Sequence, residues 1–101
     1  MDKETKTLMK SVYQKVAVGF TQDDLIHIAD EMQHGGHGGF IQALGLALQR
    51  ADLGNQRTIV QGVGEKFNFQ YYLDRWETAN PHYFVGLKII YDRENPTPVA
   101  A

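Results

Sequence analysis

Apolar residues recur at helical spacing through most of this chain, which predicts a mainly α-helical fold. In the first segment they return every fourth residue, at Leu8, Val12, Val16 and Phe20. This period predicts a first helix over residues 4–18, with lysines on its solvated side. Gly19 then supplies the expected stop signal.

The second helix has the clearest start signal in the chain. Thr21 is a favoured N-cap residue, and Asp24 three positions later completes a variant of the capping box. An amphipathic stripe follows at Leu25, Ile28, Ala29 and Met32. The same spacing puts three polar side chains on the opposite face, so we expect solvent exposure of His27, Glu31 and His34.

Residues 40–51 are apolar almost all round, which predicts the central helix of the fold. Gly45 lies within this segment and would let a neighbouring helix pack closely against it. We expect a fourth helix that is capped by Asn55 and weakened at Gly62 and Gly64, because glycine is a poor helix former.

The last third of the chain is rich in aromatic residues, and residues 66–76 are predicted to be helical. Residues 82–92 leave two readings open, because their apolar positions fit both a helical period and the alternation of a strand. We favour the helix, since no second strand is evident to pair with this segment. Residues 95–101 show no pattern and are expected to be disordered.

These segments predict one all-α domain over residues 1–94. It is a small bundle of four to five helices with a Gly/His corner between the second and third helices. A domain of 101 residues is small enough to gain stability from oligomerisation. We expect its core to contain Val12, Val16, Leu25, Ile28, Met32, Leu44, Leu48, Ile59, Val63 and Phe67.

Composition and charge disfavour several classes of function. The formal net charge is −2, which disfavours a nucleic acid partner. Cysteine is absent, which excludes disulfides, thiolate metal ligands and cysteine nucleophiles. No apolar run approaches the roughly 20 residues of a membrane span, so we expect a cytoplasmic protein without a membrane partner. The one serine, Ser11, stands in no catalytic motif, which favours a protein without enzymatic activity.

Two histidines set among four glycines form the most distinctive stretch, His34–Gly39. Imidazole and carboxylate groups suit zinc or nickel, and the candidate ligands are His27, Glu31, His34 and His37. His27 and His34 lie two turns apart, about 10 Å along a helix, so a shared ion requires the last turn to unwind. We favour the alternative, a glycine corner with solvated histidines and no cofactor.

The same corner precedes a helix start, where free N–H groups favour an anion. Its candidate residues are Gly35, Gly36, Gly38 and Gly39. The stretch lacks the Lys-Ser/Thr pair of a P-loop, which weakens this reading. A DNA-binding helix-turn-helix is a third option, but the third helix offers a DNA groove only Gln42, Gln49 and Arg50.

Eight of the eleven aromatic residues fall in the last third of the chain, more than one small core easily buries. Tyrosine and tryptophan are favoured anchors of interfaces. A core alone and a core with an interface remain equal alternatives for this region. The candidate interface residues are Tyr71, Tyr72, Trp76, Tyr83 and Tyr91.

The run from Gly39 to Asp52, together with Asn55 and the pair Phe67 and Tyr71, resembles a pattern of small helical proteins encoded by phages and prophages. In those proteins an Ala-Asp-x-x-Asn turn joins an apolar helix to one that ends in aromatic residues. The resemblance covers residues 38–72 and departs at Val63-Gly64, where a Phe-Pro-like element is more usual. It implies a mobile-element setting and stoichiometric binding to a host or phage component, and it transfers no catalytic residue.

The leading functional hypothesis is therefore a non-enzymatic interaction protein that self-associates and binds a protein partner through its aromatic C-terminal region. A metal-binding or small-anion-binding protein that uses the His34–Gly39 corner is the alternative.

Overall fold

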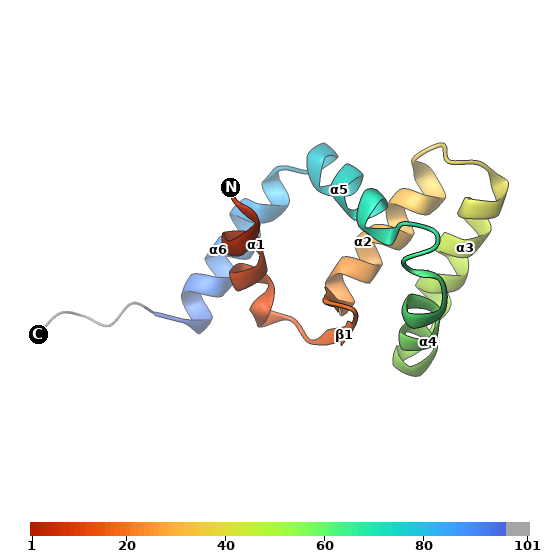
Figure 1. Ribbon diagram of the computed structural model, residues 1–101. Helices are drawn as coiled ribbons and strands as arrows, with labels where there is room; N and C mark the ends of the chain where they lie inside the picture. Colours follow the sequence, from red (N-terminus) through yellow and green to blue (C-terminus); the bar gives the residue numbers. More distant parts are fainter. Residues whose placement is uncertain (97–101) are drawn as a thin grey trace, which may run out of the picture.

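The computed structural model describes residues 1–96, which are mainly helical, as predicted (Figure 1). They form six α-helices and a small β-hairpin, so the expected bundle of four to five helices is corrected. The expected tail is described only at residues 95 and 96, and residues 97–101 lie outside the described part. In chain order the elements are α1 (Lys3–Met9), the 3-10 turn η1 (Lys10–Val12), β1 (Lys15–Ala17), β2 (Phe20–Thr21), α2 (Gln22–His34), α3 (Gly39–Arg50), α4 (Leu53–Val63), α5 (Phe69–Ala79) and α6 (His82–Glu94).

The first helix is shorter than predicted, because α1 ends at Met9 and the chain turns into an antiparallel hairpin after η1. Strand β1 pairs with β2, with Lys15 opposite Thr21 and Ala17 opposite Phe20. The predicted helix over residues 4–18 is thus wrong in its second half. Valine favours strands, and Gly19 at φ +83° forms the turn between the strands rather than a helix stop.

Helix α2 is the central element, packed between α3 and α5 (Figure 1). Its start is the predicted capping box: the Asp24 N–H donates to the Thr21 hydroxyl at 2.9 Å, and the Thr21 N–H donates to the Asp24 carboxylate at 3.0 Å. Its apolar stripe is buried along its whole length.

Helix α3, predicted to be central, lies at the outside of the fold. It packs on α2 and buries only Gly45 and Leu48, while Phe40 stays exposed. Its close approach at Gly45 is confirmed, since a Cβ there would lie 2.7 Å from the Met32 Cβ. The apolar residues on all sides of α3 therefore leave an apolar surface exposed, and they do not mark α3 as the central helix.

The core has two parts. The main cluster gathers around α2, and a second cluster of Met9, Phe84 and Leu87 joins α1 to α6. Of the expected core residues, five are buried: Val16, Leu25, Ile28, Met32 and Leu48. The other five are half-buried against these clusters: Val12, Leu44, Ile59, Val63 and Phe67.

The later helices differ from the prediction mainly at their ends. The Asp52 carboxylate, and not Asn55, caps α4, because it accepts the Asn55 N–H at 2.8 Å. Helix α4 ends at Val63, next to the predicted break at Gly64. Residues 82–92 are helical within α6, which decides between the two readings of this segment. No helix within residues 1–96 is long and apolar enough to cross a membrane.

Candidate functional site

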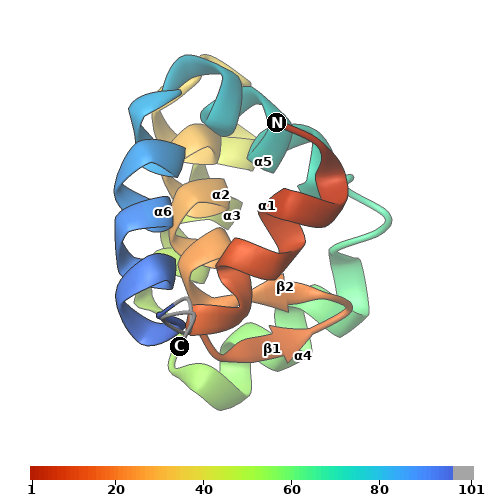
Figure 2. The same cartoon turned by 90° about the vertical axis from the view of Figure 1, so that its left-hand side faces the viewer.

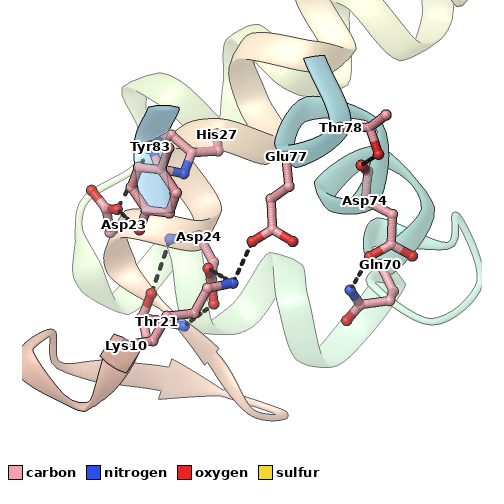
Figure 3. Close-up of polar contacts among 10 residues, drawn as sticks. All are labelled: Lys10, Thr21, Asp23, Asp24, His27, Gln70, Asp74, Glu77, Thr78 and Tyr83. Atoms are coloured by element: carbon pink, nitrogen blue, oxygen red, sulfur yellow. Dashed lines mark hydrogen bonds and ion pairs between the residues drawn. The ribbon is translucent and has the colours of Figure 1, made fainter. Parts of the chain in front are cut away.

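A buried ion cluster lies where the α1–α6 side of the molecule meets α2 and α5 (Figure 3). The Lys10 ammonium, on η1, is 2.8 Å from the Asp24 carboxylate on α2 and donates to the Glu77 carboxylate on α5 at 2.6 Å. All three side chains are almost fully buried. The cluster therefore connects three elements that are distant in the sequence.

The cluster also fixes the protonation state of Lys10. Burial alone would lower the pKa of Lys10, but its hydrogen bonds and ion pairs with Asp24 and Glu77 outweigh burial and raise it. Lys10 is thus a permanently charged anchor and not a neutral amine that could act as a nucleophile.

Two hollows open on either side of α1. The larger, about 840 Å³, is an apolar groove between α1, α5 and α6, with Phe84, Val85 and Ile89 in its α6 wall. The smaller, about 570 Å³, lies between α1, the hairpin, the start of α2 and α5. Both volumes fall in the range of ligand-binding pockets, which is roughly 300–1,000 Å³.

A stacked aromatic group lies next to the ion cluster and joins α2, α5 and α6. The His27 ring is parallel to the Trp76 ring, with centroids 3.6 Å apart and an interplanar angle of 5°. Tyr83 contacts both rings edge-on and donates its hydroxyl hydrogen to Asp23 at 2.6 Å. Burial and this hydrogen bond raise the pKa of Tyr83, so its hydroxyl stays protonated.

The structure overturns the expectation of solvent exposure for His27 and for Glu31, whose side chain is only 12% exposed. His34 is exposed, as expected. His27 is 9% exposed, because α5 and α6 cover the polar side of α2 that the amphipathic pattern assigned to solvent. Its Nδ1 atom is buried with no hydrogen-bond partner among the described residues. Burial lowers the pKa of His27, although Asp23 and Asp24 act in the opposite direction.

The four candidate metal ligands are not assembled at one point. Glu31 and His37 meet at 2.5 Å, which ties the corner back onto α2, whereas His34 points to Asp30 and His27 stacks on Trp76. Within residues 1–96, no three His, Cys, Asp or Glu side chains are grouped to hold a metal ion. A zinc or nickel site of His27, Glu31, His34 and His37 would require a different arrangement of this corner.

Backbone conformation and local packing explain three of the four glycines of the candidate anion site. Gly36 and Gly38 adopt positive φ values of +76° and +94°, and a Cβ at Gly35 would collide with the Glu31 side chain. Gly39 is the first residue of α3. The residue before it, Gly38, is the N-cap and makes no side-chain capping hydrogen bond. An anion site of these glycines remains a prediction.

The candidate interface aromatics separate into two kinds. Tyr71 is exposed, whereas Tyr72 is buried and Trp76, Tyr83 and Tyr91 are half-buried in contacts within the chain. Most of the aromatic excess is therefore used for packing between helices.

Sequence reasoning missed the ion cluster. Lys10 was assigned to a solvated helix face, Asp24 to helix capping alone, and Glu77 to no role. No local pattern marks these residues, because they come together only when η1, α2 and α5 pack. Comparison with known proteins finds no matching family model, curated protein or solved structure.

Proposed function

We propose that this protein is a non-enzymatic interaction protein that self-associates and binds a partner protein stoichiometrically. The observation that carries the proposal is the outer face of α6. Val85 and Ile89 lie one turn apart on it and are 60% and 57% exposed, and they also line the apolar groove. Unpartnered apolar side chains next to a groove are typical of protein interaction surfaces.

Gly86 on the same helix supports this surface. A glycine inside a helix costs about 1 kcal/mol relative to alanine. A Cβ at Gly86 would meet no atom of residues 1–96 within 4 Å, so packing within this part of the chain does not require the glycine. A second helix that approaches α6 closely would supply one.

The α6 face is self-complementary, which favours a second copy of this chain as its occupant. When two copies of α6 pack antiparallel around a two-fold axis that crosses the outer face midway between Val85 and Ile89, Val85 of one copy faces the partner's Ile89. His82 then faces the partner's Asp92, which pairs an imidazole with a carboxylate at each end. The α6 walls of the apolar groove in both copies would then be covered by the interface.

Binding of a host or phage protein is a separate part of the proposal. Phe40 on α3 and Tyr71 on α5 are both exposed, and neither lies on α6. Helix α3 is at the opposite end of the molecule from α6 (Figure 1). The Arg75 guanidinium lies over the Tyr71 ring at 5.7 Å. Tyrosine and arginine are enriched among the residues that dominate binding energy, so this surface is suited to a protein partner.

Sedimentation velocity of the purified chain over a concentration series tests self-association. We expect the wild type and Leu46→Lys, a matched exposed apolar position on α3, to form dimers as concentration rises. We expect Val85→Lys to remain monomeric, because it places an unpaired charge in the interface. A monomeric wild type at every concentration, or equal dimerisation of Val85→Lys, would overturn the proposal.

A further inference from the structure

Every lysine among the first fifteen residues lines one cavity. Lys3, Lys6 and Lys10 come from α1 and η1, and Lys15 comes from β1. Figure 2 shows α1 and the hairpin side by side, and the 570 Å³ cavity lies between these elements and α5. The lysines of this segment are therefore brought together by the fold and do not form a diffuse charged surface.

The rim and the floor of this cavity have different chemistry. Lys10 in the floor is neutralised by Asp24 and Glu77. At the rim, Lys3 and Lys15 have no carboxylate within ion-pair distance among residues 1–96. Lys6 lies over the Phe84 ring at 4.8 Å. The positive charge available to a ligand is thus at the rim.

The floor offers a hydrogen-bond acceptor. Glu77 is 8% exposed and uses its Oε2 atom for Lys10, while its Oε1 atom has no hydrogen-bond partner in residues 1–96. Figure 3 shows this second oxygen directed away from Lys10. A carboxylate oxygen accepts hydrogen bonds and does not donate them, so a ligand donor such as a hydroxyl group suits this position.

We propose that this cavity binds a small phosphorylated molecule that carries hydroxyl groups. Lys3 and Lys15 would hold the phosphate through charge-assisted hydrogen bonds, and Glu77 would accept a ligand hydroxyl. The hydrogen bond from Lys10 holds the Glu77 side chain in place before the ligand arrives. This ligand site is independent of self-association through α6, although Lys6, Asp74 and Glu77 line both hollows.

Isothermal titration calorimetry with three probes tests the site: ribose 5-phosphate, inorganic phosphate and ribose. We expect ribose 5-phosphate to bind most tightly and ribose not to bind, because the lysines supply most of the attraction. The first variant, Lys3→Gln/Lys15→Gln, should weaken ribose 5-phosphate binding by about tenfold or more, the value of one charge-assisted hydrogen bond.

The matched control is Arg50→Gln/Lys66→Gln, which removes the same charge from exposed positions away from the cavity. It should change the affinity by less than about twofold, because distant surface charges are screened by salt. Glu77→Gln should reduce the preference for ribose 5-phosphate over inorganic phosphate, because an amide oxygen accepts more weakly than a carboxylate oxygen. Circular dichroism identifies any variant that fails to fold, and the surface lysine variants are not expected to do so.

Three results would overturn the proposal. The first is no binding of any phosphate probe by the folded wild type. The second is an equal loss in the two charge variants, which indicates non-specific attraction. The third is tighter binding of a single-stranded oligonucleotide than of ribose 5-phosphate, with the same sensitivity to Lys3→Gln/Lys15→Gln, which assigns the lysines to a nucleic acid backbone.

Discussion

One lysine side chain has an unusual structural role in this protein. Lys10 is buried between Asp24 and Glu77 and joins η1, α2 and α5. Its removal leaves two carboxylates facing each other in a poorly solvated place. A buried charge without its partner is far more costly than an exposed one.

We therefore expect Lys10→Met to lower the free energy of unfolding by about 3 kcal/mol, as is usual when one member of a buried ion pair is removed. Urea unfolding monitored by circular dichroism measures this change. Lys15→Met, at an exposed lysine of β1, is the matched control and should stay within about 0.5 kcal/mol of the wild type. A loss for Lys10→Met that is no larger than the loss for the control would contradict the role given to the cluster.

The burial of His27 predicts how the free energy of unfolding changes in mild acid. Burial lowers the pKa of His27 in the folded chain below 6.5, the ordinary value that the unfolded chain has. The unfolded chain then binds the proton more tightly, so the contribution of His27 to stability is present above pH 6.5 and is lost as pH falls towards the folded pKa.

Urea unfolding at about pH 7.5 and about pH 5.5 detects this effect, because the two values bracket the ordinary pKa of histidine. We expect the wild type and His34→Gln, a change at an exposed histidine, to lose stability in the acidic buffer. His27→Phe retains an aromatic ring against Trp76 and should lose less. An equal loss in His27→Phe and in the wild type would show that other groups cause the pH dependence.

At the scale of helices, the contact between α2 and α3 depends on Gly45. A Cβ there would lie 2.7 Å from the Met32 Cβ and 3.0 Å from the Ala29 carbonyl oxygen. We expect Gly45→Ala to lower the free energy of unfolding by about 1–3 kcal/mol, because overpacking forces the helices apart. Thermal unfolding measures this loss of stability as a lower melting temperature.

Gly62→Ala in α4 is the control for this change, because a Cβ at Gly62 meets no atom of the described chain within 4 Å. It should raise stability by up to about 1 kcal/mol through the higher helix propensity of alanine. Stabilisation by both substitutions would contradict the close packing of α2 and α3.

The sequence predicted those features of the fold that depend on residues close together in the chain. The capping box at Thr21, the apolar stripe of α2 and the close approach at Gly45 all follow from short-range rules. The hairpin at residues 15–21 was missed, because valines at helical spacing satisfy either period in so short a segment. The central position was assigned to α3 and not to α2, because periodicity reports which residues are apolar and not which helix they meet.

The candidate site was harder to predict for the same reason. His27 and Glu31 share a face of α2, and both side chains are largely covered, His27 by Trp76 and Tyr83 and Glu31 by His37. Periodicity along α2 does not report these contacts, because they come from other parts of the chain. Lys10 and Glu77 are 67 positions apart, so only the packed fold makes them neighbours. Among the predicted interface residues, Tyr71 is the one that remains exposed.

At the scale of the whole molecule, α1 and α6 form a side group with its own small core of Met9, Phe84 and Leu87. This group contacts the larger core through the ion cluster (Figure 3). It also contacts that core through the stack of His27, Trp76 and Tyr83. Its outer face on α6 carries Val85 and Ile89, which the described residues 1–96 leave exposed. Two copies that join through α6 would cover both faces at once.

Because the chain contains no cysteine, introduced cysteines can report this arrangement without interference. The decisive measurement is mild oxidation of an equimolar mixture of Val85→Cys and Ile89→Cys, analysed by mass spectrometry, with Leu46→Cys as the control. Antiparallel packing of α6 predicts that the mixed Val85→Cys/Ile89→Cys disulfide dimer makes up more than its statistical half of all dimers. It also predicts that this mixed dimer exceeds any dimer of the control. Cross-linking no greater than that of Leu46→Cys, or a mixed dimer at no more than its statistical share, would contradict self-association through α6.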